Sequence, residues 1–335
     1  MQIQKDKSLR DYNTFGIEAF ATSFVSVRSV EELQAIIRRQ PPPYFILGGG
    51  SNLLLTQDLD ALVIHNNIFG KKIIRDFQHC VYVEAGAGEH WHEFVLWTLE
   101  KNLGGIENLS LIPGKVGASP IQNIGAYGVE LKDVFHRLEA VELATGKVRI
   151  FRKKDCQFGY RASVFKQQLR GKFCITKVIL KLSKSPRLNL SYGAIQQTLR
   201  EANVKNPTIK DVSDAVIKIR TSKLPDPAEL GNAGSFFKNP EISKAHFERL
   251  RKAFPRIVFY PLENGKIKVP AGWLIEQCGW KGKRVGHTGS HTQQALVLVN
   301  YGNATGQAIK NLAQQITESV QQKFQIKLSA EVNVI

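Results

Sequence analysis

Residues 112–128 read IPGKVGASPIQNIGAYG, and this run guides the interpretation of the whole chain. Four glycines stand among small and apolar residues, and Lys115 supplies the single charge of the run. Glycine lets a backbone approach a partner closely, whereas an ordinary surface loop is more polar. The composition therefore predicts backbone packed against a flat ligand, with edge hydrogen bonds from Gln122 and Asn123.

A second glycine segment lies about 60 residues earlier in the chain. Residues 44–47 predict a short apolar strand that runs directly into GGGSN at residues 48–52. The spacing matches neither the dinucleotide fingerprint G-x-G-x-x-G nor a Walker A loop, because no Gly-Lys-Ser/Thr follows. Such a turn can still aim its N–H groups at a phosphate, although taken alone it is more often a plain turn.

The rest of the chain alternates strand and helix patterns. Ser29 and Glu32 predict the start of a capped helix, which the prolines at 41–43 end. A turn at residues 144–147 predicts a β-hairpin. The other expected elements are strands at 24–28, 81–85, 175–182 and 295–300, helices at 271–279 and across residues 309–320, and an extended tail at 328–335. Three prolines just beyond residue 220 predict a domain boundary there.

Bulk composition limits the class of protein. A chain of 335 residues with 43% hydrophobic residues predicts two or three domains with real cores. Residues 1–10 are polar and carry no signal-peptide pattern, and no apolar run approaches the ~20 residues of a membrane span. The four cysteines are far apart and form no C-x-x-C pair, which favours a reduced compartment. We therefore expect a cytoplasmic protein.

The formal net charge of +17 leaves two interpretations open. It is compatible with nucleic-acid binding, but the basic residues are scattered and no RNP, KH or zinc-finger pattern occurs. We favour a basic surface, or at most a field that attracts small polyanions such as nucleotides. His287 and His291 lack a third ligand at a sensible spacing, so we expect no metal site.

Six motifs, in order along most of the chain, resemble the UDP-N-acetylenolpyruvoylglucosamine reductases. The first two are the glycine segments at 48–52 and 112–128. The others are YRASVFK at 160–166, KLPDP at 223–227 with GNAGSFFKNP at 231–240, AGWLIE at 271–276, and His291 with QAL at 294–296 followed by Glu331.

The resemblance implies an α+β fold. A two-part FAD-binding region of the vanillyl-alcohol-oxidase/PCMH type would span residues 1–70 and 71–220, and a C-terminal α+β substrate domain would span 221–320. The tail, residues 321–335, would return near the flavin. It further implies non-covalent FAD, NADPH as co-substrate, and reduction of UDP-N-acetylglucosamine enolpyruvate to UDP-N-acetylmuramate for peptidoglycan. We expect a monomer that binds neither nucleic acid nor membrane.

The resemblance also assigns roles to residues. Flavin N5 would deliver hydride to the enol ether, Ser235 would protonate the resulting carbanion, and Arg161 with Glu331 would stabilise the enolate. The expected FAD-binding residues are Gly48, Gly49, Gly50, Ser51, Asn52, Pro113, Gly114, Gly117, Asn123, Gly125 and Tyr127. The expected substrate-binding residues are Tyr192, Lys223, Asn239 and Gln294, with Tyr192 typical of a subgroup in which a tyrosine closes over the UDP. We expect Gly117 to combine a positive φ with close approach to FAD.

Judged without the resemblance, each of these residues has a more ordinary interpretation. Arg161 would be a surface ion-pair residue, Ser235 a turn serine, and Glu331 a solvated carboxylate. A different flavin oxidase on the same fold remains a rival, and it would lack the Ser235 segment. The chain also departs from the family pattern: Lys115 replaces a small hydroxyl residue, Ser119 an alanine, Ala330 a proline, and His287 a small or acidic residue.

Overall fold

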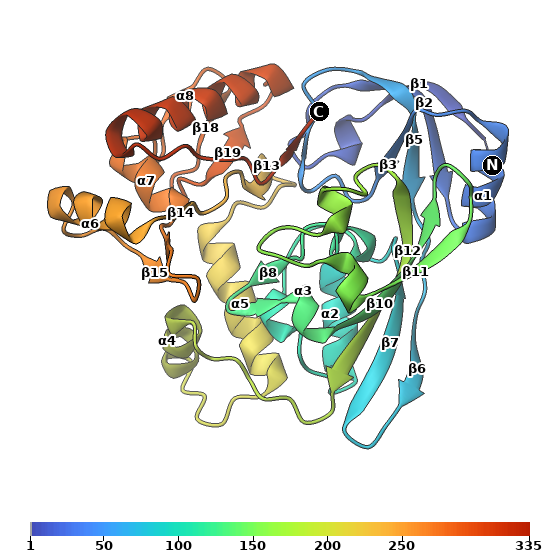
Figure 1. Cartoon of the computed structure of the whole chain (residues 1–335), viewed down its shortest axis with the longest axis horizontal. Helices are drawn as coiled ribbons and strands as arrows, with labels where there is room; N and C mark the ends of the chain where they lie inside the picture. Colours follow the sequence, from blue (N-terminus) through green and yellow to red (C-terminus); the bar gives the residue numbers. More distant parts are fainter. Residues whose placement is uncertain (1) are drawn as a thin grey trace. The chain divides into compact units, whose positions relative to one another are not determined.

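The computed structural model describes residues 2–335, and the chain divides into two compact units (Figure 1). Unit 1 contains the chain up to Lys7 together with Ala21–Gly49 and Leu59–Ser222. Unit 2 contains Ser8–Phe20, Gly50–Asp58 and Lys223–Ile335. Two N-terminal segments therefore group with the C-terminal part of the chain, which the sequence did not indicate.

The first sheet of unit 1 brings the glycine segment at 48–52 to the end of a strand. Its strands, in spatial order, are β1 (Gln4–Ser8), β2 (Phe20–Val27), β5 (Leu59–Asn66) and β3 (Tyr44–Leu47). β5 pairs in parallel with both β2 and β3, so the carboxyl ends of these strands meet at one edge. Gly48 follows β3 there, and Asn67 follows β5. The expected strand before the glycines is confirmed.

Helix α1 (Val30–Arg39) connects β2 to β3 and confirms the predicted cap. The Ser29 hydroxyl accepts a hydrogen bond from Glu32 N at 3.2 Å, and the Glu32 carboxylate accepts from Arg28 N at 2.7 Å. The first bond satisfies a backbone donor that the first helical turn leaves unpaired, and the second ties the residue before the cap to the helix. Leu33 and Ile36 point into the core, as the sequence periodicity requires.

The second sheet of unit 1 is antiparallel throughout. Its order is β11 (Val148–Arg152), β10 (Phe135–Glu142), β12 (Phe173–Ser183), β7 (Cys80–Gly86) and β6 (Lys71–Asp76). The expected hairpin is confirmed, with Val141 opposite Val148 across the turn and Gly146 at φ 71°. Short strands β8 (Gly125–Ala126) and β9 (Val129–Glu130) form a separate pair within the second glycine loop.

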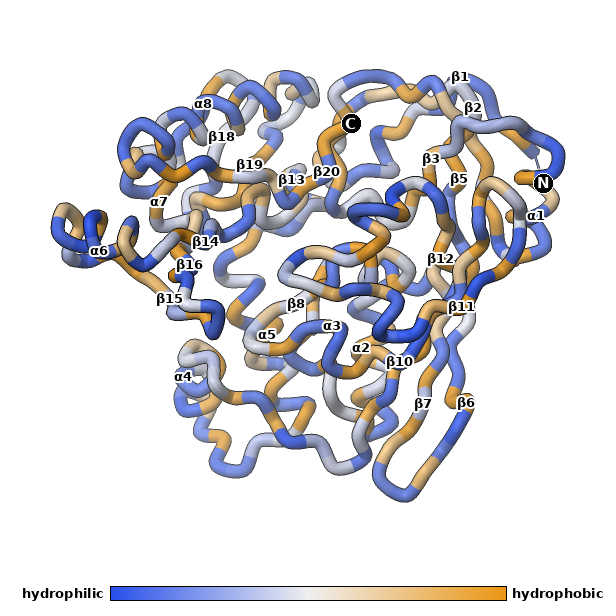
Figure 2. Tube along the Cα trace, in the orientation of Figure 1, coloured by the Kyte–Doolittle hydropathy of each residue, from blue (hydrophilic) through white to orange (hydrophobic). Residues whose placement is uncertain are grey.

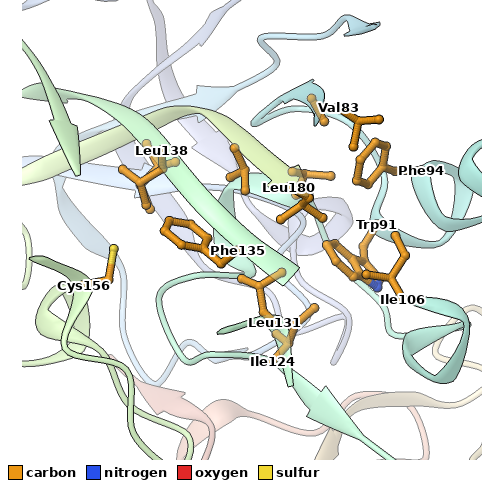
Figure 3. Packing of buried hydrophobic residues seen from close by; sticks show 14 of the residues in the cluster. Val83, Trp91, Phe94, Ile106, Ile124, Leu131, Phe135, Leu138, Cys156 and Leu180 are labelled. Atoms are coloured by element: carbon orange, nitrogen blue, oxygen red, sulfur yellow. The ribbon is translucent and has the colours of Figure 1, made fainter. Parts of the chain in front are cut away.

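Unit 1 has further helices beside this sheet and its loops (Figure 1). They are α2 (Trp91–Glu100), α3 (Leu131–Val134), α4 (Gly193–Glu201) and α5 (Ile209–Lys223), which ends at the unit boundary. Figure 3 shows Trp91 and Phe94 of α2 beside Leu180 of β12 in one buried cluster. Ile124 belongs to the same cluster, so the glycine loop is tied to the core rather than suspended in solvent.

Unit 2 is built on a four-stranded antiparallel sheet and a three-stranded one. The first has the order β13 (Gly231–Ser235), β19 (Val297–Asn300), β18 (Thr288–Ser290) and β17 (Arg284–Val285); the second has β14 (Glu241–Ile242), β16 (Ile267–Lys268) and β15 (Tyr260–Pro261). Its helices are α6 (Lys244–Ala253), α7 (Ala271–Gln277) and α8 (Gly306–Phe324). Figure 2 shows hydrophilic and hydrophobic residues interleaved along α8, as expected for an amphipathic helix.

The N-terminal segments of unit 2 pack against its C-terminal part through backbone contacts. Asn232 N donates to Thr14 O at 2.9 Å, and the Asn300 amide donates to Phe15 O at 2.8 Å. Strand β4 (Leu53–Leu54) pairs in parallel with β20 (Asn333–Val334), and Thr56 N donates to Ile335 O at 2.8 Å. The extended tail thus lies beside the segment that follows the first glycine motif. In the described chain, residues 2–335, no helix is long and apolar enough to cross a membrane.

The start of α8 gives a test of this packing. A Cβ on Gly306 would lie 1.7 Å from Leu55 O, which is backbone and cannot move aside easily. Gly306→Ala should therefore lower the free energy of unfolding by about 1–3 kcal/mol, as overpacking usually does. The exposed neighbour Gln307 provides the control, and Gln307→Ala should leave the denaturant midpoint nearly unchanged. Equal midpoints for the two variants would contradict the packing.

Candidate functional site

The two glycine segments touch each other within unit 1. A Cβ on Gly49 would lie 3.0 Å from Gly114 Cα and 3.6 Å from Lys115 Cγ, so the backbones approach more closely than side chains allow. Gly48 differs, because a Cβ there would meet nothing within 4 Å. One glycine thus serves protein packing and its neighbour borders open space.

The loop at 113–119 is anchored by backbone hydrogen bonds. Gly114 O accepts from Trp91 N at 2.9 Å, and Val116 N and Gly117 N donate to Glu89 O and Ala87 O at 2.8 and 3.0 Å. Gly117 does not have the expected positive φ; Gly114 does, at 108°. A Cβ on Gly117 would lie 2.5 Å from Ala87 Cβ. The prediction of its φ was wrong, because close packing on Ala87, not backbone direction, requires glycine there.

Asn123 organises the second half of this loop. It is fully buried; its Nδ2 donates to Glu130 Oε2 and Gly159 O, both at 3.1 Å, and its Oδ1 accepts from Lys132 N at 3.0 Å. These bonds occupy the amide that the sequence offered for edge contacts with a ligand. The Asn123 side chain therefore holds the loop in place through its bonds to Glu130, Lys132 and Gly159.

Gly125 connects the glycine loop to Arg161. The Arg161 Nη2 donates to Gly125 O at 2.6 Å, and Arg161 has a positive φ of 51°. A Cβ on Gly125 would lie 3.0 Å from Arg161 Nη1 and 2.9 Å from Glu130 Cγ. The guanidinium thus lies next to the side of Gly125 that a Cβ would occupy. The loop and the arginine are positioned together.

Tyr127 and Tyr192 lie side by side in unit 1, and sequence reasoning missed the arginine beside them. Their rings pack edge to face, with centroids 5.1 Å apart, and Tyr192 is 43% exposed. Arg220 of α5 donates from Nε to Leu111 O at 3.2 Å, where Leu111 has a φ of 57°. Burial raises the pKa of Tyr127. The charge and the hydrogen bond of Arg220 lower this pKa, but by less than burial raises it. The pattern IRTSK gave no signal for Arg220 beyond its place next to Lys223.

Burial and the neighbouring positive charge act on Arg220 itself. Burial lowers the pKa of its guanidinium, Tyr127 raises it, and Arg161 lowers it in turn. Arg161 and Arg220 are therefore close enough to repel each other. A positive region of this kind favours an anion nearby.

In unit 2 the structure brings Ser235 and Glu331 together. Ser235 ends β13 after Gly234, whose φ is 67°. Phe236 O accepts from Glu331 N at 2.8 Å, and Lys238 N donates to Ser329 O at 2.9 Å. The tail therefore pairs with the segment that directly follows Ser235. Phe236 and Phe237 are buried beside it, with ring centroids 5.1 Å apart.

Gly50, Ser51 and Asn52 also belong to unit 2, so the unit boundary divides the first glycine motif. A Cβ on Gly50 would lie 2.0 Å from Tyr12 O, and Asn52 O accepts from Asn333 N at 3.1 Å. This half of the motif holds the N-terminal segment and the tail. The turn after β3 thus serves both units.

The expected substrate residues lie in different local settings. Tyr192 precedes α4 in unit 1, and exposed Lys223 is the last residue of α5. Asn239 Oδ1 accepts from Ala271 N at 2.9 Å, so this side chain caps α7. A Cβ on Gly272 would lie 2.8 Å from Gln294 Oε1, which places Gln294 over the same helix start. Among residues 2–335 no cluster of three or more His, Cys, Asp or Glu side chains could hold a metal ion.

The residues present fit the flavin that the sequence predicts. Gly48 borders open space next to the contact between Gly49 and Gly114, and these glycines belong to the two segments expected to bind FAD. Glycine backbone at such a place can approach a planar ring or a phosphate closely. We call Gly48, Gly49 and Gly114 the cradle, because their backbone fits FAD without intervening side chains.

Comparison with known proteins agrees with this fold and site. A model of FAD-binding domains matches residues 21–152, and a model of the C-terminal domain of UDP-N-acetylenolpyruvoylglucosamine reductase matches residues 226–335. Together they define a flavoprotein of mixed helix and strand whose FAD-binding region is followed by a reductase C-terminal domain. This confirms the predicted α+β class and the FAD cofactor.

Full-length relatives identify the family. The UDP-N-acetylenolpyruvoylglucosamine reductase of Flavobacterium johnsoniae is 56% identical over 100% of both chains, and that of Pseudomonas aeruginosa is 50% identical over 100% of this chain and 99% of its own. The crystal structure of the Thermus caldophilus reductase superimposes with a TM-score of 0.67 at 25% identity, covering 99% of this chain and 98% of that one. The chain belongs to the UDP-N-acetylenolpyruvoylglucosamine reductase family.

Gly48 and Gly117, one from each glycine segment, should respond differently to the same substitution. Gly48→Ala places its Cβ in open space and should leave the stability of the apoprotein unchanged while lowering FAD affinity. Gly117→Ala drives a Cβ toward Ala87 and should destabilise the apoprotein by about 1–3 kcal/mol. Thermal unfolding of apoprotein and flavin fluorescence titration measure the two effects separately. Normal FAD affinity in Gly48→Ala would contradict the cradle.

Proposed function

We propose that this chain is the FAD-dependent reductase that converts UDP-N-acetylglucosamine enolpyruvate to UDP-N-acetylmuramate with NADPH, in peptidoglycan precursor synthesis. The observation that carries this proposal is 56% identity over the full length of a relative named for the reaction. The segment GNAGSFFKNP at residues 231–240 further favours the reductase over another flavin oxidase. When bound, FAD supplies hydride transfer from NADPH to the enol ether.

We place the FAD cradle in residues 1–70 and 71–220, with 221–320 as the substrate domain and the tail returning near the flavin. The contact of Gly49 with Gly114 supports a cradle shared by the first two parts. The pairing of β20 with β4 supports the return of the tail, because β4 directly follows the first glycine motif. Ser51, Asn52, Pro113 and Tyr127 complete the proposed FAD-binding set.

Arg161 stabilises the negative charge that develops on the substrate carboxylate. A guanidinium offers a rigid pair of donors that match two carboxylate oxygens. Its bond to Gly125 O holds one Nη and so fixes the direction of the fork before substrate arrives. A donor oriented in advance needs no reorganisation during the reaction, which is how such groups lower the barrier.

Ser235 supplies the proton to the substrate carbon next to the carbon that receives hydride. Serine is a weak acid, but a carbanion is a strong base, and a hydroxyl within hydrogen-bond reach suffices. Gly234 allows the backbone to come close, and buried Phe236 keeps water out of the strand end. Glu331 N donates to the carbonyl of Phe236, the residue after Ser235. From this position a protonated or bridged carboxyl can support the enolate.

Lys223, Tyr192, Asn239 and Gln294 hold the UDP-sugar in this proposal. Lys223 meets the diphosphate as an exposed ammonium, and the exposed ring of Tyr192 closes over the UDP, as in the tyrosine subgroup. We further propose a monomer in the cytoplasm, with no nucleic-acid partner. The high net charge then serves to attract the two nucleotide substrates.

The proton donor can be tested by separating the two half-reactions. Ser235→Ala should leave reduction of the flavin by NADPH near normal and slow its reoxidation by the enolpyruvyl substrate by ~10²-fold, the usual worth of a positioned acid. Ser235→Cys should restore part of the rate, because a thiol also donates a proton. Stopped-flow absorbance of the flavin follows both steps. Slower reduction, or unchanged reoxidation, would show that Ser235 is not the acid.

Substrate contacts can be tested by binding. Lys223→Ala should raise KM for the UDP-sugar far more than it slows flavin reduction, and the effect should shrink as salt rises, since exposed charges are screened. Tyr192→Phe should weaken substrate binding modestly and leave FAD content unchanged, because the ring remains. A KM that does not respond to salt would contradict the electrostatic role of Lys223. A structure with bound substrate in which Tyr192 points away from the UDP would contradict the role of Tyr192.

A further inference from the structure

The antiparallel sheet of unit 1 gathers basic residues that are far apart in the sequence. Arg137 of β10 lies directly opposite Arg152 of β11, and Ile179 of β12 lies opposite Arg137 on its other side. Residues opposite each other on neighbouring strands share a face of the sheet. Lys181 stands two positions after Ile179, so its side chain points to that same face. Three cations from three strands therefore lie on one face.

The row that begins at Lys181 continues across β7 and β6. Tyr82 lies opposite Lys181, and Arg75 lies opposite Tyr82. His136, at an irregularity in the pairing of β10 with β12, packs its ring edge to face on Tyr82, with centroids 4.6 Å apart. We call this set of side chains the basic face: Arg75, His136, Arg137, Arg152 and Lys181.

His136 responds to the positive charge of this face. Partial burial lowers the pKa of His136, and four neighbouring charges lower it further, those of Arg137, Arg75, Arg152 and Lys181. The four cations are therefore close enough to act on one imidazole. Like charges directly opposite each other destabilise a sheet, so the pair Arg137–Arg152 costs stability unless an anion comes near.

The glutamates on these strands are shared with other lysines. Glu84 Oε1 lies 3.6 Å from Lys72 Nζ and 3.7 Å from Lys177 Nζ. Glu139 Oε2 lies 3.7 Å from the same Lys177 Nζ. These carboxylates are thus occupied by cations outside the basic face.

The basic face keeps donors that no carboxylate uses. Arg137 Nη2 lies 3.9 Å from Glu139 Oε1, and the buried Nε of Arg137 has no hydrogen-bond partner within residues 2–335. Asp76 is next to Arg75 in the chain but pairs with Lys184. In the same described part of the chain no carboxylate forms an ion pair with the remaining three cations, Arg75, Arg152 and Lys181.

The width of the basic face requires an extended partner. Arg152 in β11 and Arg75 in β6 are separated by the strands β10, β12 and β7. Four strand spacings of ~4.8 Å make ~19 Å, which is more than a single phosphate or carboxylate can reach. An extended chain of about six residues, at ~3.3 Å each, covers that distance.

The aromatic rings on this part of the sheet favour a protein over a nucleic acid. Phe77 is 50% exposed and packs edge to face on Tyr82, which contacts His136 in the same way. Rings that cover one another do not present the parallel faces on which successive bases stack. Arginine and aromatic side chains together are typical of protein interfaces. A second copy of this chain is disfavoured, because its net charge is also +17.

We propose that the basic face is a docking surface for an extended acidic segment of another protein. Alternate side chains of an extended segment point to one side, so a row of carboxylates can meet the cations across the strands. Phe77 offers an apolar contact at the edge of the surface. None of these residues belongs to the cradle or to the proposed catalytic and substrate residues. Docking therefore goes beyond the proposed function and does not rest on it.

Peptide binding to the full-length protein tests the proposal. The probe is a fluorescein-labelled peptide of about eight residues in which glutamate alternates with threonine, long enough at ~3.3 Å per residue to cross the basic face. Fluorescence anisotropy should show saturable binding that weakens as salt rises, because exposed charges are screened. The same peptide with glutamine in place of glutamate should not bind. No binding of the glutamate peptide, or equal binding of both peptides, would overturn the proposal.

Variants of equal charge locate the binding. Arg152→Gln combined with Lys181→Gln should weaken binding of the glutamate peptide roughly tenfold, since two exposed ion pairs are lost. Lys244→Gln combined with Arg249→Gln removes the same charge from exposed positions of α6 and should bind the peptide normally. Both double variants should keep the FAD content and the thermal midpoint of the wild type. An equal loss of affinity in both would show that only net charge matters, and the proposal would fail.

His136 provides a second measurement at the surface itself. A bound row of carboxylates brings negative charge next to the imidazole, so the pKa of His136 should rise when the glutamate peptide is added. Titration by NMR follows this pKa, and His136→Gln identifies the signal by its loss. A peptide that binds without changing the pKa of His136 binds elsewhere, which would contradict the assignment of the surface.

Other anionic partners are outcomes of the same assay. Oligothymidylate and vesicles of phosphatidylglycerol are the probes for a single-stranded nucleic acid and for a membrane surface. If either binds more tightly than the peptide and loses affinity in the Arg152→Gln, Lys181→Gln variant, the basic face does not serve an acidic protein segment. A chain without reductase activity would contradict the proposed function, while peptide binding would still decide the docking surface.

Discussion

The close approach of Gly49 to Gly114 is the constraint on which the flavin region depends. A Cβ at Gly49 would lie 3.0 Å from Gly114 Cα, so the two glycine segments could not keep their present spacing. The first segment follows a strand of the parallel sheet, and the second is bonded to the antiparallel sheet and α2 through Ala87, Glu89 and Trp91. The contact therefore joins the two layers of unit 1 at the point where their loops meet.

The loop that carries Gly114 makes two further contacts. The Lys115 Nζ lies near His65 at the end of β5, and Gly125 O accepts a hydrogen bond from Arg161. The glycines of these segments serve different purposes. Gly117 packs closely on Ala87, Gly114 has a positive φ, and Gly48 borders open space. Hydrogen bonds limit the freedom of the loop, since Gly114 O, Val116 N, Gly117 N and the Asn123 amide are all bonded within the protein.

Local patterns predicted the elements well because they depend on near neighbours in the chain. The cap at Ser29, the hairpin around Gly146 and the amphipathic α8 follow from side-chain spacing alone. Helix α5 was not predicted, although its buried residues Val212, Ala215, Val216 and Ile219 recur at helical spacing and could have indicated it. The grouping of Ser8–Phe20 with the C-terminal part was also out of reach, because it rests on backbone bonds such as Asn232 N to Thr14 O that carry no sequence pattern.

The candidate site was predicted by ordered motifs, and the roles of single residues were harder to infer. The motifs assigned Ser235 and Glu331 to the same predicted site. In unit 2 Glu331 N donates to Phe236 O, so Glu331 lies beside the residue that follows Ser235. The amide of Asn123 was expected to face a ligand, but buried partners use it instead. Arg220 could not be found, because a lone arginine in a helix has no recognisable spacing.

Unit 2 is discontinuous in the chain, and this limits how evolution can rearrange the protein. Residues 223–335 lack the strand partner of β20 and the Phe15 backbone that covers Gly231, since both come from the first 58 residues. A recombination event that cut the gene near codon 222 would not transfer a complete folding unit. Transfer of the C-terminal region alone would therefore leave β20 and Gly231 without these partners.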